Sequence, residues 1–127
     1  MKEDTTRKYD LEERLLEYAS EVIRLVDMFP SSLAGRHVAG QLLRSGTNPL
    51  PQHGEAQAAE SPEDFRHKMK VALKELKEAW RWLRLSKKAP LLPNPASLDP
   101  MLRETDELIR IFAASIRTSE TNSAKKK

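Results

Sequence analysis

Residues 61–88 read SPEDFRHKMKVALKELKEAWRWLRLSKK and specify a long helix with three different faces. Ser61 suits the cap of a helix, Pro62 suits its first turn, and the two acids that follow suit the positive end of the helix dipole. The lysines at 87 and 88 suit the opposite end, where the last carbonyl groups favour cations. The pattern therefore predicts a helix over residues 62–87.

One face of this helix is apolar and another is basic. At about 100° per residue, the apolar side chains fall in one arc about 100° wide, which predicts the core-facing side. The arc contains Phe65, Met69, Ala72, Leu76, Ala79, Trp80 and Leu83. A second arc, roughly 130° away, holds only cations beyond the first turn. It contains Arg66, Lys70, Lys74, Lys77, Arg81, Arg84 and Lys88.

Three further helices are predicted on either side of this one. Apolar residues at helical spacing after Asp10, a candidate cap, predict a helix over 10–29 that stops at Pro30. Small residues mark a helix over 33–59, which Pro49 and Pro51 interrupt because each removes an amide donor. A proline-rich linker leads to a helix over 100–118.

These helices predict an all-α protein, an antiparallel up-down-up-down four-helix bundle over residues 10–118 with helix two kinked or broken near Pro49 and Pro51. Residues 1–9 are expected to be a flexible N-terminus. Residues 119–127 are polar and end in lysine, so we expect a disordered tail. The chain of 127 residues favours one domain.

Composition excludes several classes of protein. The sequence has no Cys, which excludes disulfides and thiolate sites and fits a reducing cytoplasm. No apolar run approaches the roughly 18 residues of a membrane span, so we expect no membrane association. The net charge is only +3, which argues against a strongly basic nucleic-acid domain.

An enzyme is not expected from this sequence. It has no nucleophile elbow, no phosphate-binding glycine loop and no dinucleotide fingerprint. Asp64-x-x-His67 imitates half of a di-iron motif, but His67 falls outside the core arc and no second motif exists. We therefore expect no catalytic residue, no metal, no cofactor and no small-molecule substrate.

Some apolar residues lie off the predicted core faces. Val71 and Trp82 share a third face of the helix over 62–87, and Leu16 and Ile23 lie outside the core arc of the first helix. Two explanations are open: a broad core within one chain, or a subunit interface. Because Trp is favoured at interfaces, we predict self-association through these four residues.

The basic face has two interpretations as well. Residues 10–29 carry six acids and two arginines, so the cations can pair with an acidic face of the first helix, in the same or a neighbouring subunit. Alternatively, the basic face follows a line of phosphates and gains affinity through counterion release. The near-neutral composition favours the first interpretation.

Motifs spread over residues 9–116 resemble the four-helix-bundle proteins of the 23S rRNA intervening-sequence (S23) family. They are Arg44-Ser45, Glu55-Ala56, Asp64-Phe65, Lys74-Glu75 and Trp82-Leu83, in that order. The resemblance implies an antiparallel four-helix protomer and a ring-like homopentamer. The chain is also similar to the accessory protein of diversity-generating retroelements, a positively charged pentamer that binds a reverse transcriptase and nucleic acid.

Within this resemblance, the cations Arg44, Lys68 and Lys74 stand at positions where the family motif also has cations. The chain departs from the family at Pro49-Leu50-Pro51-Gln52-His53-Gly54, where a single Pro and an Asn are usual. We therefore expect a non-enzymatic homo-oligomeric scaffold whose basic face, with Arg44 and Lys68, contacts RNA, DNA or a reverse-transcriptase-like enzyme. The alternative is a protein-interaction module without a nucleic-acid ligand, in which the cations pair with the acidic first helix of a neighbouring subunit.

Overall fold

The chain is all-helical throughout the part that the structure describes. The computed structural model describes the backbone of residues 2–125 and the side chains of residues 11–125. The elements, in order, are α1 (Lys2–Val26), α2 (Leu33–Thr47), α3 (Pro49–Gln57), α4 (Pro62–Lys88), the 3-10 helix η1 (Pro95–Leu98) and α5 (Asp99–Lys125). No strand occurs among these residues.

Helices α2 and α3 form one rod with a bend at Asn48. Asn48 has helical dihedral angles, and its amide donates to the carbonyl of Arg44 at 3.1 Å. The next residue is Pro49, which has no amide to donate and therefore interrupts the helix. The predicted interruption of helix two is confirmed, and the second part ends at Gln57 rather than at residue 59.

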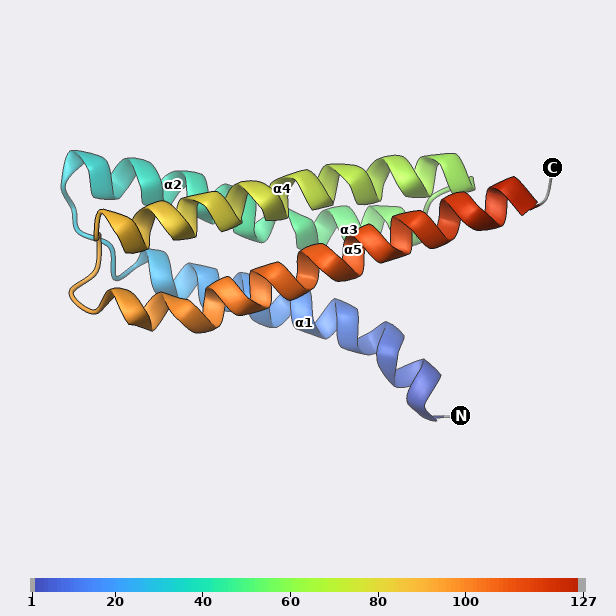
Figure 1. The fold of residues 1–127 in the computed structure, drawn as a ribbon, viewed down its shortest axis with the longest axis horizontal. Helices are drawn as coiled ribbons and strands as arrows, with labels where there is room; N and C mark the ends of the chain where they lie inside the picture. The colour runs from blue at the N-terminus through green and yellow to red at the C-terminus, as the bar shows by residue number, and fades with distance from the viewer. Residues whose placement is uncertain (1, 126–127) are drawn as a thin grey trace.

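Helix α4 is the element around which the others are arranged. It packs against α2, α3 and α5, whereas α1 packs against α2 and α3. Figure 1 shows the α1–α2 and α4–α5 connections at one end of the molecule and the α3–α4 connection at the other. The long faces of α4 are thus fixed by neighbours on two sides.

The first helix differs from its prediction at both ends. It begins at Lys2 instead of Asp10, so the backbone of residues 2–9, which were expected to form a flexible N-terminus, is helical. They contain no Pro or Gly to stop a helix, which explains the extension. The helix ends at Val26 because the amides of Met28 and Phe29 bond to carbonyls three residues back, which tightens the last turn. Met1 lies outside the described residues.

The last helix also runs further than predicted, from Asp99 to Lys125 instead of over 100–118. Residues 119–125 were expected to belong to a disordered tail. They are polar, but they lie against the start of α4, where Arg66 and Lys70 contact their side chains. These contacts explain the extra turns of helix. Residues 126–127 lie outside the described residues.

The core is formed by all of the helices. Its largest fully buried side chains include Tyr18, Leu42, Leu76 and Phe112, from four different helices. Tyr18 and Thr105 share a hydrogen bond of 2.7 Å between their hydroxyl groups, which satisfies both groups in the interior. Burial raises the pKa of Tyr18 above its ordinary value of 10.0, since the phenolate would lose its hydration.

Helices α1 and α2 approach each other closely at Gly46. A Cβ atom at Gly46 would lie 2.8 Å from Cγ2 of Val22, which is closer than packed side chains allow. The small residue therefore lets the second helix lie against the first. None of the described helices has the length and apolar character needed to cross a membrane.

Candidate nucleic-acid interface

Helix α4 is anchored at both ends. Oγ of Ser61 accepts a hydrogen bond from the amide of Asp64 at 3.0 Å, so the predicted helix start is confirmed. At the other end, Nζ of Lys87 donates to Oδ1 of Asp99 on α5 at 2.7 Å. The first contact defines where α4 begins, and the second joins its end to α5.

The apolar face of α4 fixes its rotation. Its fully buried apolar side chains are Met69, Ala72, Leu76, Ala79 and Leu83, all of which belong to the predicted core arc. Phe65 and Trp80, also predicted to face the core, are only partly buried. Because the buried arc is fixed, the opposite side of the helix lies outside the bundle.

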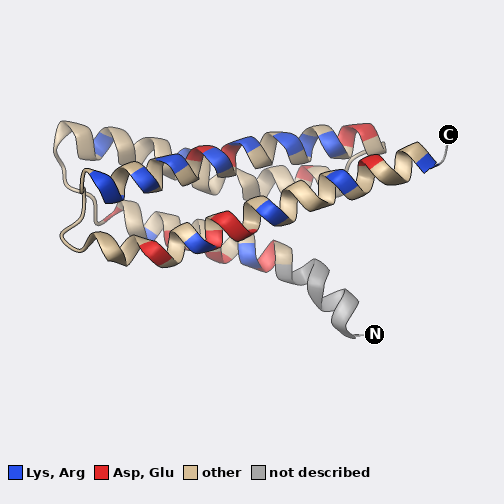
Figure 2. Ribbon diagram, in the orientation of Figure 1, with Lys and Arg blue, Asp and Glu red and all other residues tan. Residues whose placement is uncertain are grey.

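That outer side carries a row of cations, which we call the basic stripe: Lys70, Lys74, Lys77, Arg81, Arg84 and Lys88. All six are exposed. Figure 2 shows blue bands along the length of α4, with red bands at its start and near its middle. Lys88 lies 18 positions after Lys70, roughly 27 Å along the helix, which matches the rise of about eight phosphates along one strand of B-DNA.

The basic stripe has few acidic partners. Among the described residues, Lys70 alone of the six forms an ion pair, with Glu120 at 3.6 Å, and both side chains are more than half exposed. Such exposed pairs contribute little to stability, on the order of 0–1 kcal/mol. The other five cations are therefore available to an external anion.

Two shallow grooves open along the basic stripe. The first has a volume of about 380 Å³, and the second has about 830 Å³. The first is lined mainly by the cations Lys70, Lys74, Lys77 and Arg81, with Leu73 and Glu78. The second combines the cations Arg81, Arg84, Lys87 and Lys88 with two leucines, Leu85 and Leu102. The basic stripe is thus cationic at one end and both cationic and apolar at the other.

Arg66 was predicted to belong to this surface, but it points to α5 instead. Its Nη1 donates to the carbonyl oxygen and to Oγ of Ser119, at 3.2 and 3.0 Å, and to Oγ of Ser123 at 2.8 Å. The side chain is partly buried. Arg66 therefore holds the end of α5 rather than extending the basic stripe.

Trp80 lies beneath the basic stripe. The guanidinium of Arg84 lies 4.5 Å from the centroid of the Trp80 ring, and that of Arg81 lies 6.0 Å from it. Both distances allow a cation–π attraction. Because the arginines cover this ring, the surface offers charge to phosphates rather than an aromatic platform for bases.

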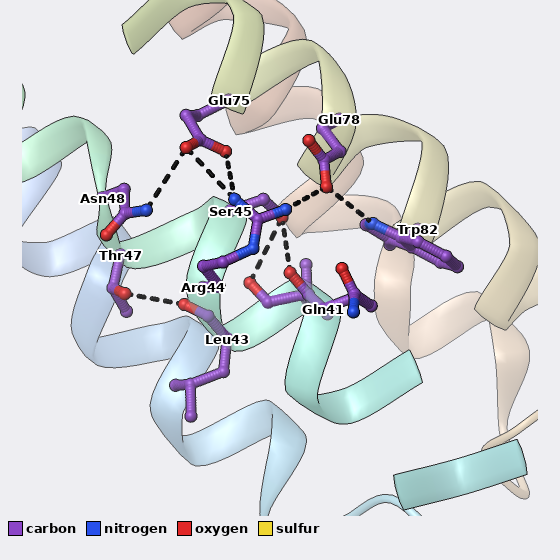
Figure 3. Close-up of polar contacts among 10 residues, drawn as sticks. Gln41, Leu43, Arg44, Ser45, Thr47, Asn48, Glu75, Glu78 and Trp82 are labelled. Atoms are coloured by element: carbon purple, nitrogen blue, oxygen red, sulfur yellow. Dashed lines mark hydrogen bonds and ion pairs between the residues drawn. The ribbon is translucent and has the colours of Figure 1, made fainter. Parts of the chain in front are cut away.

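Arg44 and Lys68 lie outside the basic stripe and are paired within the chain. Figure 3 shows the first network: Nη1 of Arg44 donates to Oε1 of Glu75 at 2.9 Å, and Nη2 contacts Glu78. Lys68 lies 3.3 Å from Oδ1 of Asp64. Both cations were predicted to bind nucleic acid, and both form ion pairs within the chain.

The four predicted interface residues fall into two groups. Trp82 packs against the core, its ring lies 5.9 Å from that of His37 on α2, and its Nε1 donates to Glu78 at 3.4 Å. Val71 is also partly buried. One chain therefore accounts for the burial of this face of α4. Leu16 and Ile23, in contrast, remain about half exposed on α1.

Polar contacts elsewhere join α1 to the bundle. Arg14 donates to Glu104 through Nε and Nη2, at 3.0 and 2.8 Å, and to Glu107 at 3.0 Å. Hydrogen bonding to Glu104 raises the pKa of Arg14. His53 is buried and shares a contact of 3.1 Å with Oε1 of Glu12. No group of three acidic or histidine side chains among the described residues is placed to hold a metal ion.

Comparisons with known proteins agree with this fold. The sequence matches no protein-family model and no curated protein. The structure is similar to the crystal structure of a protein of unknown function from the S23 ribosomal protein family of Bacteroides thetaiotaomicron VPI-5482. The two chains are 26% identical, with a TM-score of 0.73, over 83% of this chain and 96% of the other. The similarity to a retroelement accessory protein stays a prediction.

Proposed function

We propose that this protein is a non-enzymatic, homo-oligomeric helical scaffold that binds the phosphate backbone of nucleic acid along the basic stripe. The proposal is supported by one observation above all. Lys74, Lys77, Arg81, Arg84 and Lys88 lie exposed in a row, and none of them has an acidic partner among the described residues. A row of this kind releases counterions when it binds a polyanion.

The local row of charge matters more here than the charge of the whole chain. The net charge is only +3, because acids elsewhere offset the cations. Figure 2 shows these acids on other helices and also among the cations along α4. A potential concentrated on one face is enough to attract a polyanion, even when the protein is close to neutral.

The resemblance to the S23 family makes the proposal more specific about the protomer, the oligomer and the partner. The protomer is an antiparallel up-down-up-down bundle, the oligomer is a homopentamer, and the protein works in the cytoplasm. Its partner is RNA or DNA, alone or together with a reverse-transcriptase-like enzyme. Within this proposal the basic stripe binds through backbone phosphates, so the affinity depends little on base sequence.

A charge reversal in the basic stripe tests the function. Lys74→Glu is expected to weaken the binding of labelled RNA and DNA at low salt, measured by fluorescence anisotropy. Arg36→Glu is the matched control, since Arg36 is an exposed cation on α2 and the charge change is the same. Equal loss of affinity in both variants, or no binding by the original protein, contradicts the proposal.

A second candidate function is a protein-interaction module whose cations pair with the acidic first helix of a neighbouring subunit. The exposed carboxylates of Glu13, Glu17 and Asp27 on and after α1 favour it. In that case high salt loosens the assembly, and RNA does not compete. Molar mass in solution, measured against salt concentration with and without RNA, separates the two functions.

A further inference from the structure

Two half-apolar surfaces of the molecule remain without a partner among the side chains that the structure describes. The first, which we call the α1 strip, consists of Leu16, Ser20 and Ile23. These residues lie four and three positions apart and so share one side of α1. Leu16 is 47% exposed and Ile23 is 49% exposed, although α1 already packs against α2 and α3 by its other side.

The second surface is the larger groove at the end of the basic stripe, which we call the leucine groove. Leu85, which is 47% exposed, and Leu102 form its apolar part. Its charged part consists of Arg81, Arg84, Lys87 and Lys88. A phosphate backbone has no apolar groups to pack against exposed leucines. This end of the basic stripe therefore suits a ligand that is both apolar and acidic.

The charges around the two surfaces are opposite. Exposed carboxylates flank the α1 strip, from Glu12, Glu13 and Glu17 at one end to Asp27 at the other. They outnumber Arg24, an exposed cation beside Ile23 that pairs with Glu17 at 3.3 Å. Cations flank the leucine groove. In a specific interface, apolar groups pack together at the centre and opposite charges meet at the rim. This arrangement gives the interface both affinity and specificity.

We infer that the leucine groove of one copy holds the α1 strip of a second copy. This inference rests on the proposed homo-oligomer and assigns the surfaces that build it. The two surfaces belong to different helices, so the contact is heterologous: each copy offers one strip and one groove. Repetition of such a contact closes into a ring when the rotation between copies fits.

The inference also divides the basic stripe between two tasks. The leucine groove, from Arg81 to Lys88, is covered by the neighbouring copy. The smaller groove beside Lys70, Lys74 and Lys77 stays open to phosphates. An assembly would therefore present one such cationic segment from each copy to the same polyanion, which raises avidity without any new contact.

Single charge changes at exposed apolar positions test the inference. Leu16→Lys places a cation against the basic groove, and Leu85→Glu places an acid against the acidic strip. Each variant is expected to reduce the molar mass, measured by light scattering, from that of the assembly to that of one chain. Leu33→Lys is the matched control, because Leu33 is 80% exposed on α2 and belongs to neither surface. It is expected to leave the assembly intact.

The double variant gives a positive test. Leu16→Lys combined with Leu85→Glu in one chain brings opposite charges together across the contact, so the molar mass is expected to rise again. An original protein that is a single chain in solution overturns both the proposed homo-oligomer and this inference. An assembly that survives both single changes, or that Leu33→Lys also disrupts, overturns this inference alone. Circular dichroism of each variant checks that the helices are intact.

Discussion

Two sides of α4 carry charged residues, and they differ in how those charges are balanced. On the side toward α2, Glu75 and Glu78 bind Arg44, and Glu78 also accepts a hydrogen bond from Trp82. On the outer side, Lys74, Lys77 and Arg84 have no acidic partner among the described residues. The same helix therefore holds one satisfied network and one row of unbalanced charge.

The difference shows which charges belong to the fold. Arg44 was predicted to contact nucleic acid, yet its contacts join two helices of one chain. The outer cations stabilise no described contact of that kind, and their mutual repulsion opposes the folded state. Their presence is explained by something outside the chain, which is the physical basis of the proposed binding surface.

The largest expected effect comes from the core face that supports both sides. Leu76→Ala removes a fully buried side chain and should lower the free energy of unfolding by roughly 2–5 kcal/mol. Urea denaturation followed by circular dichroism measures this change. Leu33→Ala is the matched control, because Leu33 is 80% exposed on α2 and belongs to neither contact surface, so the change should stay within about 0.5 kcal/mol. A loss below about 1 kcal/mol for Leu76→Ala would mean that α4 is rotated about its axis so that Leu76 does not face the core.

Trp82→Ala should give the next largest effect. The side chain is partly buried against His37 and the core, so its loss should cost less than the roughly 3–5 kcal/mol of a fully buried Trp. Since these contacts lie within one chain, the molar mass of the assembly should not change. A variant with normal stability and reduced molar mass would instead place Trp82 between subunits.

Arg44→Ala tests the side of α4 that faces α2, where the charges are paired. Glu75 is only 14% exposed and loses its ion-pair partner, while Arg44 itself is 45% exposed, so we expect a loss of about 1 kcal/mol. A double-mutant cycle with Glu75→Gln measures the coupling between the two residues. RNA affinity should remain unchanged. Reduced affinity at normal stability would move Arg44 to the binding surface.

Lys77→Ala is expected to have the smallest effect on stability. The side chain is exposed and has no acidic partner among the described residues, so the free energy of unfolding should change by less than about 0.5 kcal/mol. RNA binding should weaken in the same variant. A clear loss of stability with unchanged RNA affinity would contradict this account, because the outer cations would then serve the fold as the paired charges toward α2 do.

Much of the fold could be predicted from local chemistry. The cap at Ser61, the buried arc of α4 and the bend at Pro49 each follow from neighbouring residues, and each is confirmed. The helix ends could not be predicted equally well. The extension of α5 depends on Arg66, which lies 53 residues before its partner Ser119. No local pattern reports such a contact.

The candidate site shows the same limit. Helical spacing placed the cations on one face, but it could not say which of them have partners. The pairing of Arg44 with Glu75 joins residues 31 positions apart and depends on how α2 packs against α4. The third face of α4 was ambiguous for the same reason: spacing locates Trp82 on a face, but only packing shows that α2 covers it.

The central claim, that unbalanced charge on the outer side of α4 binds phosphates, is tested most directly by salt. The affinity of the original protein for a short RNA should be measured from about 50 mM to about 200 mM salt. If Lys70, Lys74 and Lys77, the cations that the neighbouring copy leaves open, each neutralise one phosphate, the plot of log K against log salt concentration should have a slope of about −2 to −3 for each copy that binds. A slope near zero, or no binding at the lowest salt concentration, would contradict the claim.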